Sequence, residues 1–238
     1  MDDAATRTPL RVVSLVPSLT ETLLAWDVTP IACTRFCEQP SIVHVGGTKD
    51  PDVGAIIAMQ PDVVLMDREE NRLPDAEALQ AAGVEVLATH IVSIDDVASL
   101  VAVRTRLGLA AEPLDDGSGT AIEPVGRSAF VAIWRRPWMT CNAATYGSSM
   151  LASIGVSNVF ADHADTYPTV TIDEVVGCAP DLILLSSEPY PFKARHIAEW
   201  SDATPDASVR LIDGQDLFWW GARTAAARQR LAQALRAS

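Results

Sequence analysis

The sequence predicts an α/β protein of two lobes, each with a parallel β-sheet, on the basis of three observations. The strongest is an internal repeat, because residues 53–66 (VGAIIAMQPDVVLM) and 172–185 (IDEVVGCAPDLILL) align without a gap. Short apolar runs also alternate with helical segments along both halves, which indicates parallel strands joined by right-handed crossovers. Finally, these runs are apolar throughout, as expected for strands whose sheet is covered on both faces.

Each copy of the repeat predicts a short helix, a Pro-Asp turn and a buried strand. In the first half, residues 11–28 precede the repeat and predict a strand, a turn and an amphipathic helix. Ser18 or Thr20 is expected to cap that helix, with Glu21 close behind. A further helix and a strand at 84–89 (VEVLAT) follow the repeat unit.

The second half has the same order of elements. Residues 128–156 predict a strand, a turn and a helix before the repeat unit, and a strand at 209–214 (VRLIDG) follows it. The Ala- and Arg-rich C-terminal segment predicts a final helix. We therefore expect an N-terminal lobe over residues 10–93 and a C-terminal lobe over residues 128–238.

Residues 94–127 are expected to form a linker helix and a loop. The helix falls within residues 94–109, where aspartates stand near the front and Gly108 stands near the end. Residues 110–127 are rich in Pro and Gly, which are unfavourable inside a helix, so the linker helix should be short.

Charge and composition exclude several functions. The chain has 31 Asp and Glu against 18 Lys and Arg, and its net charge of −13 repels nucleic-acid phosphates and anionic lipid. No apolar run approaches the ~20 residues that cross a bilayer. The first ten residues contain no apolar export segment. We therefore expect a cytoplasmic protein for the chain as written, or a periplasmic or other extracytoplasmic one if a leader has been removed.

The four cysteines are too few for a disulfide scaffold and are expected to be free thiols. Cys33 and Cys37 lack two further ligands at a spacing typical of zinc sites. The motifs G-x-S-x-G, H-E-x-x-H and Walker A are absent from the sequence. We therefore expect neither catalytic residues nor a metal ion held by the protein.

Ligands of open parallel sheets bind beyond the carboxyl ends of the strands. The loops at those positions hold four of the six tryptophans and two of the three tyrosines. Aromatic loops suit a large, flat, partly apolar ligand, and nearby arginines suit carboxylate or phosphate groups on it. The candidate ligand-binding residues are Phe36, Arg68, Glu69, Trp134, Trp138, Tyr167, Tyr190, Phe192, Asp216, Trp219, Trp220 and Arg223.

Some of these assignments have an alternative. Trp134 directly follows a predicted strand and Trp138 lies beside a proline turn, so the alternative for either of them is a role in the core. Trp219 and Trp220 are adjacent, so at least one of them should point outward and contact a ligand or an interface.

Several blocks of the sequence resemble, in order and spacing, class III periplasmic binding proteins. These are the helical-backbone metal receptors, which include the vitamin B12-binding branch of ABC-importer substrate-binding proteins. The blocks are residues 11–26, 34–40, 45–71, 78–87, 133–140, 157–162, 180–193 and 213–223. They lie in both halves of the chain, so the resemblance is more specific than any single motif.

The resemblance implies two Rossmann-like lobes with parallel sheets, joined by a linker helix, with a ligand cleft between the lobes. It implies a non-catalytic protein that binds a corrinoid-like, tetrapyrrole or metal-chelate ligand, such as cobalamin, haem or a ferric siderophore, without a covalently bound cofactor. Phe36, Met139, Tyr167 and Asp216 stand at ligand-contacting positions of the vitamin B12-binding branch.

A partner is implied as well, namely an ABC permease that acidic residues of each lobe would contact. The candidate docking acids are Asp50, Asp52 and Asp173. The alternative interpretation is a cytosolic enzyme or corrinoid-handling protein that reuses the same scaffold, because a fold does not fix an activity.

Overall fold

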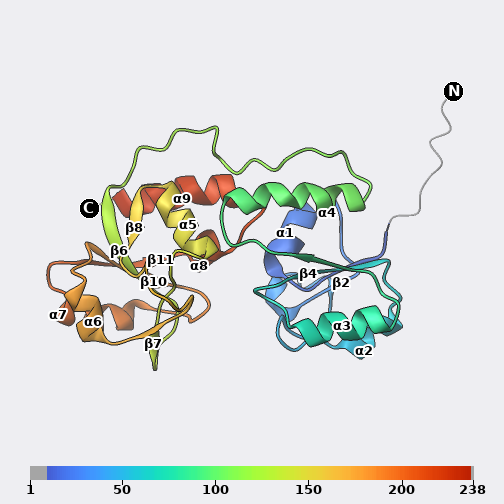
Figure 1. Cartoon of the computed structure of the whole chain (residues 1–238), viewed down its shortest axis with the longest axis horizontal. Helices are drawn as coiled ribbons and strands as arrows, with labels where there is room; N and C mark the ends of the chain where they lie inside the picture. Colours follow the sequence, from blue (N-terminus) through green and yellow to red (C-terminus); the bar gives the residue numbers. More distant parts are fainter. Residues whose placement is uncertain (1–9, 237–238) are drawn as a thin grey trace. The chain divides into compact units, whose positions relative to one another are not determined.

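The computed structural model describes residues 10–236 (Figure 1). Residues 1–9, on which the prediction of location largely rests, and residues 237–238 lie outside the described part. The chain divides into two compact units. The first comprises residues up to His90 together with Ser99–Pro113, and the second comprises Ile91–Ala98 and the residues from Leu114 onward. The lobe boundaries predicted after residues 93 and 127 stay predictions.

The first unit contains a five-stranded, all-parallel sheet with the strand order β3-β2-β1-β4-β5. Its strands are β1 (Val12–Ser14), β2 (Ala32–Cys33), β3 (Val43–His44), β4 (Val63–Asp67) and β5 (Val86–Thr89). Its helices are α1 (Pro17–Ala25), α2 (Val53–Ala58), α3 (Leu73–Ala81) and α4 (Val101–Arg106), with a short 3₁₀ turn, η1 (Arg35–Cys37). In Figure 1, α1 covers one face of the sheet, and α2 and α3 cover the other.

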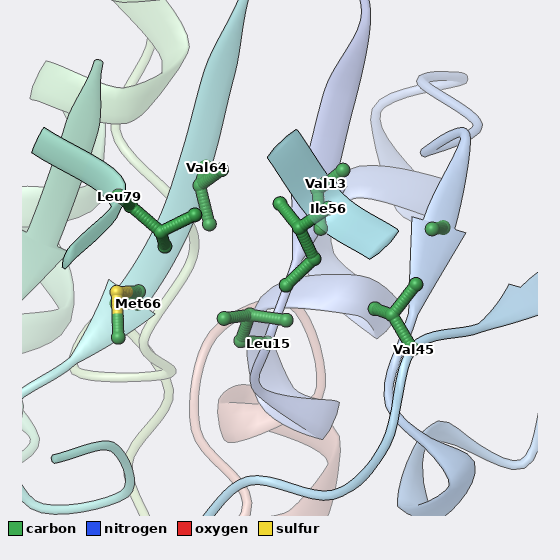
Figure 2. Close-up of a cluster of buried hydrophobic side chains, with 8 residues drawn as sticks. Val13, Leu15, Val45, Ile56, Val64, Met66 and Leu79 are labelled. Atoms are coloured by element: carbon green, nitrogen blue, oxygen red, sulfur yellow. The ribbon is translucent and has the colours of Figure 1, made fainter. Parts of the chain in front are cut away.

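The core of the first unit lies between the sheet and the pair α2 and α3. Val13 and Val64 point from β1 and β4 towards Ile56 of α2 and Leu79 of α3 (Figure 2). Successive side chains of a strand point to opposite faces, and Val12, on the other face of β1, is fully buried too. Burial of both faces explains why these strands read as continuous apolar runs.

The expected side-chain cap of α1 is absent. Pro17 occupies the first turn of α1 and Val16 is the N-cap residue, so Ser18 and Thr20 lie inside the helix. The hydroxyl of Thr20 instead lies 3.1 Å from the Val16 carbonyl oxygen and 3.2 Å from Cys37 Sγ. The proline fixes the start of the helix earlier than the hydroxyl side chains suggest.

The second unit contains a four-stranded parallel sheet with the order β11-β10-β6-β8 and a separate antiparallel pair, β7-β9. Its strands are β6 (Arg127–Ala132), β7 (Trp138–Met139), β8 (Val156–Asn158), β9 (Thr169–Val170), β10 (Leu182–Ser186) and β11 (Ser208–Ile212). Its helices are α5 (Tyr146–Ser153), α6 (Ile172–Gly177), α7 (Ile197–Ala203), α8 (Gly214–Phe218) and α9 (Thr224–Arg236). Figure 1 shows α5 and α9 on one face of the sheet and α6 and α7 on the other. Both units are thus α/β with parallel sheets, as predicted.

The internal repeat is confirmed residue by residue. Helices α2 and α6, and the starts of strands β4 and β10, occupy the same positions in the two copies. Each helix is capped at the equivalent residue: Asp52 accepts a hydrogen bond from the Ala55 N–H at 2.9 Å, and Thr171 accepts one from the Glu174 N–H at 3.2 Å. The neighbouring strands agree as well, since β5-β4-β1-β2 of the first sheet corresponds to β11-β10-β6-β8 of the second.

The turn between helix and strand is also the same in both copies. Gln60 (φ 49°) and Ala179 (φ 45°) adopt the left-handed conformation that ends each helix, and a proline follows each of them. Asp62 and Asp181 then accept a hydrogen bond from a backbone N–H near the beginning of the adjacent strand, at 2.6 and 2.7 Å. The Pro-Asp pair therefore ties each repeat unit to the central strand of its sheet.

The linker region begins with a 3₁₀ segment, η2 (Asp95–Leu100), that continues into α4. Between α4 and β6 the chain, which is described throughout, contains no helix or strand. The buried guanidinium of Arg228 on α9 donates hydrogen bonds to the carbonyl oxygens of Gly117 and Ser153 and so holds this segment in the second unit. Among residues 10–236, no helix combines the length and apolar character that crossing a bilayer requires.

Candidate ligand-binding site

The loops after β6, β10 and β11 leave the second sheet at its carboxyl edge, where ligands of parallel sheets bind. They carry most of the candidate residues of this unit. These loops carry two groups of side chains, one aromatic and one polar.

Five aromatic rings lie next to one another in space and form a row. The order along this aromatic row is Trp134, Tyr190, Phe192, Trp138 and Trp200. Successive ring centroids are 5.5, 4.7, 5.7 and 4.9 Å apart. These separations are typical of stabilising aromatic pairs. The row begins at Trp134, which is 43% exposed, and ends at Trp200, which is fully buried. It therefore connects the surface of the second unit with its core.

Both interpretations of the tryptophans apply to part of this row. Trp138 and Tyr190 are half-buried and pack against the core, while Trp134 presents a large exposed surface. Phe192 is a core residue, because its ring stacks on Trp138 with an interplanar angle of 7° and only 5% of it is exposed. Its assignment as a ligand contact stays a prediction, and little of its ring is accessible. The exposed Trp134 and the half-buried Tyr190 are the more accessible part of the row.

Arg135 holds the turn between Trp134 and Trp138. Its guanidinium lies 5.8 Å from the ring centroid of Trp138 and bonds Glu199 of α7 at 2.8 Å. The turn is closed by backbone hydrogen bonds from Ile133 to the Met139 carbonyl and from Met139 to the Trp134 carbonyl. The half-buried Met139 is thus fixed in β7 next to the row.

The polar cluster shares the loop after β10 with the row, because Glu188 and Tyr190 both belong to that loop. Its members are Glu188, Gln215, Asp216, Trp219, Arg223 and Arg230. The Trp219 Nε1–H donates to Glu188 at 2.9 Å, and the Arg223 guanidinium lies 4.8 Å from the Trp219 ring centroid. The indole of Trp219 is therefore fixed both at its edge and at one face.

Asp216 is the buried anion of the polar cluster. Arg230 donates to both of its carboxylate oxygens, at 2.6 and 2.7 Å, and Arg223 lies 3.6 Å away. Bidentate pairing of this kind is strong and directional. The carboxylate of Asp216 thus joins α8 to α9 and lies near Arg223, and Asp216 stays a predicted ligand contact. Arg230 lies 14 residues further along the chain, and sequence reasoning missed it.

The adjacent Trp219 and Trp220 differ in exposure, as expected for neighbours. Trp219 is half-buried, whereas only 4% of Trp220 is exposed. Trp220 therefore packs in the interior, and its assignment as a ligand contact stays a prediction. Tyr167 lies in a bend before Pro168 and is 45% exposed.

In the first unit, the candidates lie at the carboxyl edge of its own sheet. Phe36 is half exposed on η1, with the Arg35 guanidinium 4.8 Å from its ring centroid. Arg68 and Glu69 are exposed in the loop after β4. The backbone of Glu69 is held by the Asp67 carboxylate at 2.9 Å and by Lys49 Nζ at 2.6 Å. All three stay predicted ligand contacts.

A buried polar pair shapes that loop. Asn71 accepts a hydrogen bond from the Asp67 N–H at 2.8 Å and donates to the carbonyl oxygens of Leu15 and Thr48, at 3.1 and 2.9 Å. Asp67 accepts a further bond from the Thr89 hydroxyl at 2.7 Å. These contacts join the ends of three neighbouring strands, so Asp67 and Asn71 position the loop that carries Arg68 and Glu69. Within residues 10–236, no three His, Cys, Asp or Glu side chains are grouped so that they could hold a metal ion.

His196 lies at the end of the short turn before α7 and packs against two rings of the aromatic row. Its ring lies 5.8 Å from Tyr190 and 5.5 Å from Phe192, and Nδ1 accepts a hydrogen bond from the Lys193 N–H at 2.9 Å. Burial, followed by the charges of Arg195, Arg135 and Lys193, holds the pKa of His196 below its ordinary value, while Glu199 acts in the opposite direction. The imidazole is therefore neutral near pH 7.

This neutral histidine makes stability depend on pH. Because the pKa of His196 is lower in the folded than in the unfolded chain, its contribution is complete above about pH 6.5 and is lost as the pH falls below that value. We expect the melting temperature to fall more between pH 7.5 and pH 5 in the wild type than in His196→Gln. The exposed His163→Gln is the control. Equal falls for the wild type and His196→Gln would show that the imidazole does not contribute.

The chain is similar to proteins that bind vitamin B12 or haem. It is 24% identical over 195 residues to the vitamin B12-binding protein of Salmonella typhi, a match that spans 75% of this chain and 73% of the relative. The fold matches the periplasmic haem-binding protein BhuT in complex with two haems, with a TM-score of 0.82, 19% identity and coverage of 95% and 98% of the two chains. It also matches the periplasmic vitamin B12-binding protein BtuF of Vibrio cholerae, with a TM-score of 0.77, 19% identity and coverage of 96% and 97%. No family model matches the sequence.

The fold is therefore that of the class III periplasmic binding proteins, with two α/β lobes. The resemblance of this sequence to the helical-backbone metal receptors, and among them to the vitamin B12-binding proteins, is confirmed.

Proposed function

We propose that this chain is a non-catalytic binding protein for a corrinoid or another tetrapyrrole-type ligand. The observation that carries the proposal is the aromatic row, which opens onto the carboxyl edge of the second sheet at Trp134 and Tyr190. The names of the relatives point to the same class of ligand, since they bind vitamin B12 or haem. A flat macrocycle matches aromatic side chains in both shape and polarity.

The polar cluster supports recognition of the edge of such a ligand. Trp219 is held at its edge by Glu188 and at one face by Arg223, so its ring is preorganised before a ligand arrives. Preorganisation raises affinity because fewer side-chain conformations are lost on binding. We assign the ligand contacts of the second unit to Trp134, Tyr190, Trp219 and Arg223. Trp138, Met139 and Tyr167 are further candidates around them.

A metal chelate such as a ferric siderophore remains within the proposal, because arginines near an aromatic surface also suit anionic chelates. The enzyme alternative has less support. The relatives carry the names of binding proteins, and within the described residues the carboxylates Glu188 and Asp216 are engaged by Trp219 and Arg230.

An ABC permease is the proposed partner. Asp173 is exposed in the first turn of α6 and fits a docking role. Asp52 already caps α2, and Asp50 pairs with Arg35 at 3.1 Å, so both also have a structural role. With a permease partner, the protein would act outside the cytoplasm, as the relatives described as periplasmic do.

Absorbance titrations with haemin and with cyanocobalamin test the proposed function. We expect one of them to bind with one ligand per chain, and Trp134→Ala to weaken binding at least about tenfold. Loss of one aromatic contact and of its buried apolar area exceeds about 1.4 kcal/mol, which corresponds to that factor.

Leu211→Ala is the matched control, because Leu211 is 44% exposed and Trp134 is 43% exposed in the same unit. Equal affinity of the wild type and both variants would exclude this aromatic surface as the site. Absence of binding to either compound, and to ferric siderophores, would overturn the function itself.

A further inference from the structure

Positive charge is concentrated on the two segments that carry the aromatic row. Residues 134–138 and 190–200 hold four of the chain's 18 Lys and Arg residues, but only one of its 31 Asp and Glu residues. The four cations are Arg135, Arg136, Lys193 and Arg195, and together they are called the basic patch. The whole chain has a net charge of −13, so the basic patch is a local exception to its acidic character.

The two segments lie side by side in the second unit. The Tyr190 N–H donates a hydrogen bond to the Ile133 carbonyl oxygen at 3.3 Å, and the ring centroids of Trp134 and Tyr190 are 5.5 Å apart. Arg135 of the first segment bonds Glu199 of the second at 2.8 Å. The four cations therefore come from neighbouring segments, although about 60 residues separate these segments along the chain.

Three of the four cations keep their charge uncompensated. Arg136, Lys193 and Arg195 are exposed, and within residues 10–236 none of the three is ion-paired with a carboxylate. Arg135 differs, because it bonds Glu199, which is the one acid of the two segments. The positive charge that remains beside the aromatic row favours an anion at this place on an otherwise acidic protein.

Arg136 lies in the turn between Trp134 and Trp138. Its φ of 68° is left-handed, a conformation that Gly and Asn adopt at lower cost than Arg. The backbone of the turn therefore gives no reason for an arginine at this position. The guanidinium of Arg136 is attached two residues from Trp134, the exposed end of the aromatic row, where a charged contact can add to an aromatic one.

We propose that the basic patch selects ligands with free carboxylates at their edge, so that an anionic tetrapyrrole binds more tightly than a neutral one. This inference rests on the proposed function, because it assigns an aromatic and a charged contact to the same ligand. The aromatic row contacts the face of the macrocycle, and Arg136 and Lys193 pair with its peripheral carboxylates. A guanidinium can donate two parallel hydrogen bonds to a carboxylate, whereas an ammonium acts as a point charge.

The test compares haemin with its dimethyl ester, which has the same ring and iron but no free carboxylates. At low ionic strength, we expect the full wild-type chain to bind haemin at least about tenfold more tightly than the ester. Charge-assisted hydrogen bonds to a carboxylate can supply the ~1.4 kcal/mol that corresponds to this factor. Raising the salt concentration from about 0.01 to about 0.1 M shortens the Debye length from about 30 to about 10 Å and should reduce the preference.

A double variant and a matched control locate the preference. Arg136→Gln combined with Lys193→Gln should reduce the preference for haemin to less than about threefold and leave the affinity for the ester unchanged. Arg127→Gln removes one positive charge from the start of β6, at the amino edge of the same sheet, and should behave like the wild type.

The outcomes separate this inference from the proposed function. Equal wild-type affinities for haemin and its ester, or tighter binding of cyanocobalamin than of haemin, would overturn the role of the basic patch and leave the proposed function in place. An equal loss of preference in Arg127→Gln and in the double variant would overturn that role as well. Absence of binding to all three compounds would overturn the proposed function and this inference with it. The wild-type comparison needs no substitution, so a variant that fails to fold leaves the inference falsifiable.

Discussion

Replacing Trp220 by Ala is expected to lower the free energy of unfolding by about 3–5 kcal/mol, the usual cost of removing a buried large aromatic side chain. Only 4% of Trp220 is exposed, so its loss leaves a cavity in the interior of the protein. The measurement is denaturant-induced unfolding of the wild type and the variant without ligand, followed by circular dichroism. The loss should appear as a lower midpoint with little change in slope.

Its neighbour provides the matched control. Trp219 is half-buried and bonds Glu188 through Nε1, so Trp219→Ala is expected to cost only about 1–2 kcal/mol. Ligand affinity should show the opposite order, because Trp219 belongs to the proposed contact surface and Trp220 does not. Equal losses of stability in the two variants would mean that Trp220 is not a core residue.

The second large effect concerns Asp216. Asp216→Ala removes a buried carboxylate and leaves Arg223 and Arg230 without their shared anion. We expect a loss of about 2–3 kcal/mol in the free energy of unfolding. This is less than the ~3–5 kcal/mol for a fully buried pair, because the Arg230 side chain is about half exposed.

A double-mutant cycle tests the origin of this loss. With Arg230→Ala as the second substitution, the two effects should be clearly non-additive, because the partners donate and accept two direct hydrogen bonds. Asp213→Ala, at the N-cap of the same helix α8, is the control and should cost only about 1 kcal/mol. Additive effects of Asp216→Ala and Arg230→Ala would contradict the assigned role.

The repeat is the part of the fold that could be predicted best. Helices α2 and α6 begin at Val53 and Ile172, the residues that open the two aligned segments, because an identical order of apolar and turn residues encodes the same helix and strand. The pair β7-β9 could not be predicted. Each of its strands has only two residues, too few to show a period of two.

The candidate site could be predicted in position but not in detail. Placing loops at the carboxyl edge of a parallel sheet needs only the strand order along the chain. Whether a particular tryptophan in such a loop is buried depends on its tertiary neighbours. For this reason Trp134 is exposed and Trp220 is buried, although both lie in such loops. The bond between Asp216 and Arg230 joins α8 to α9 and has no local pattern in the sequence.

Helix caps show the same division between local and tertiary information. Asp52 was a candidate for docking to a permease, yet in the structure it caps α2 as Thr171 caps α6. The capping role of Asp52 could be predicted from the repeat, since Asp52 and Thr171 occupy equivalent positions directly before the two aligned segments. At α1, in contrast, Pro17 overrides the hydroxyl residues that suggested a later start.

A tetrapyrrole-type ligand bound by this chain should be released unchanged. The most direct measurement is the absorbance spectrum of the protein purified from cells supplied with cobalamin and haem, followed by extraction and mass analysis of any bound pigment. We predict one retained chromophore, close to one per chain, that is recovered chemically unchanged. A colourless protein whose spectrum stays unchanged after addition of haemin, cyanocobalamin, cobinamide or a ferric siderophore would contradict the claim, and a chemically altered pigment would favour an enzyme.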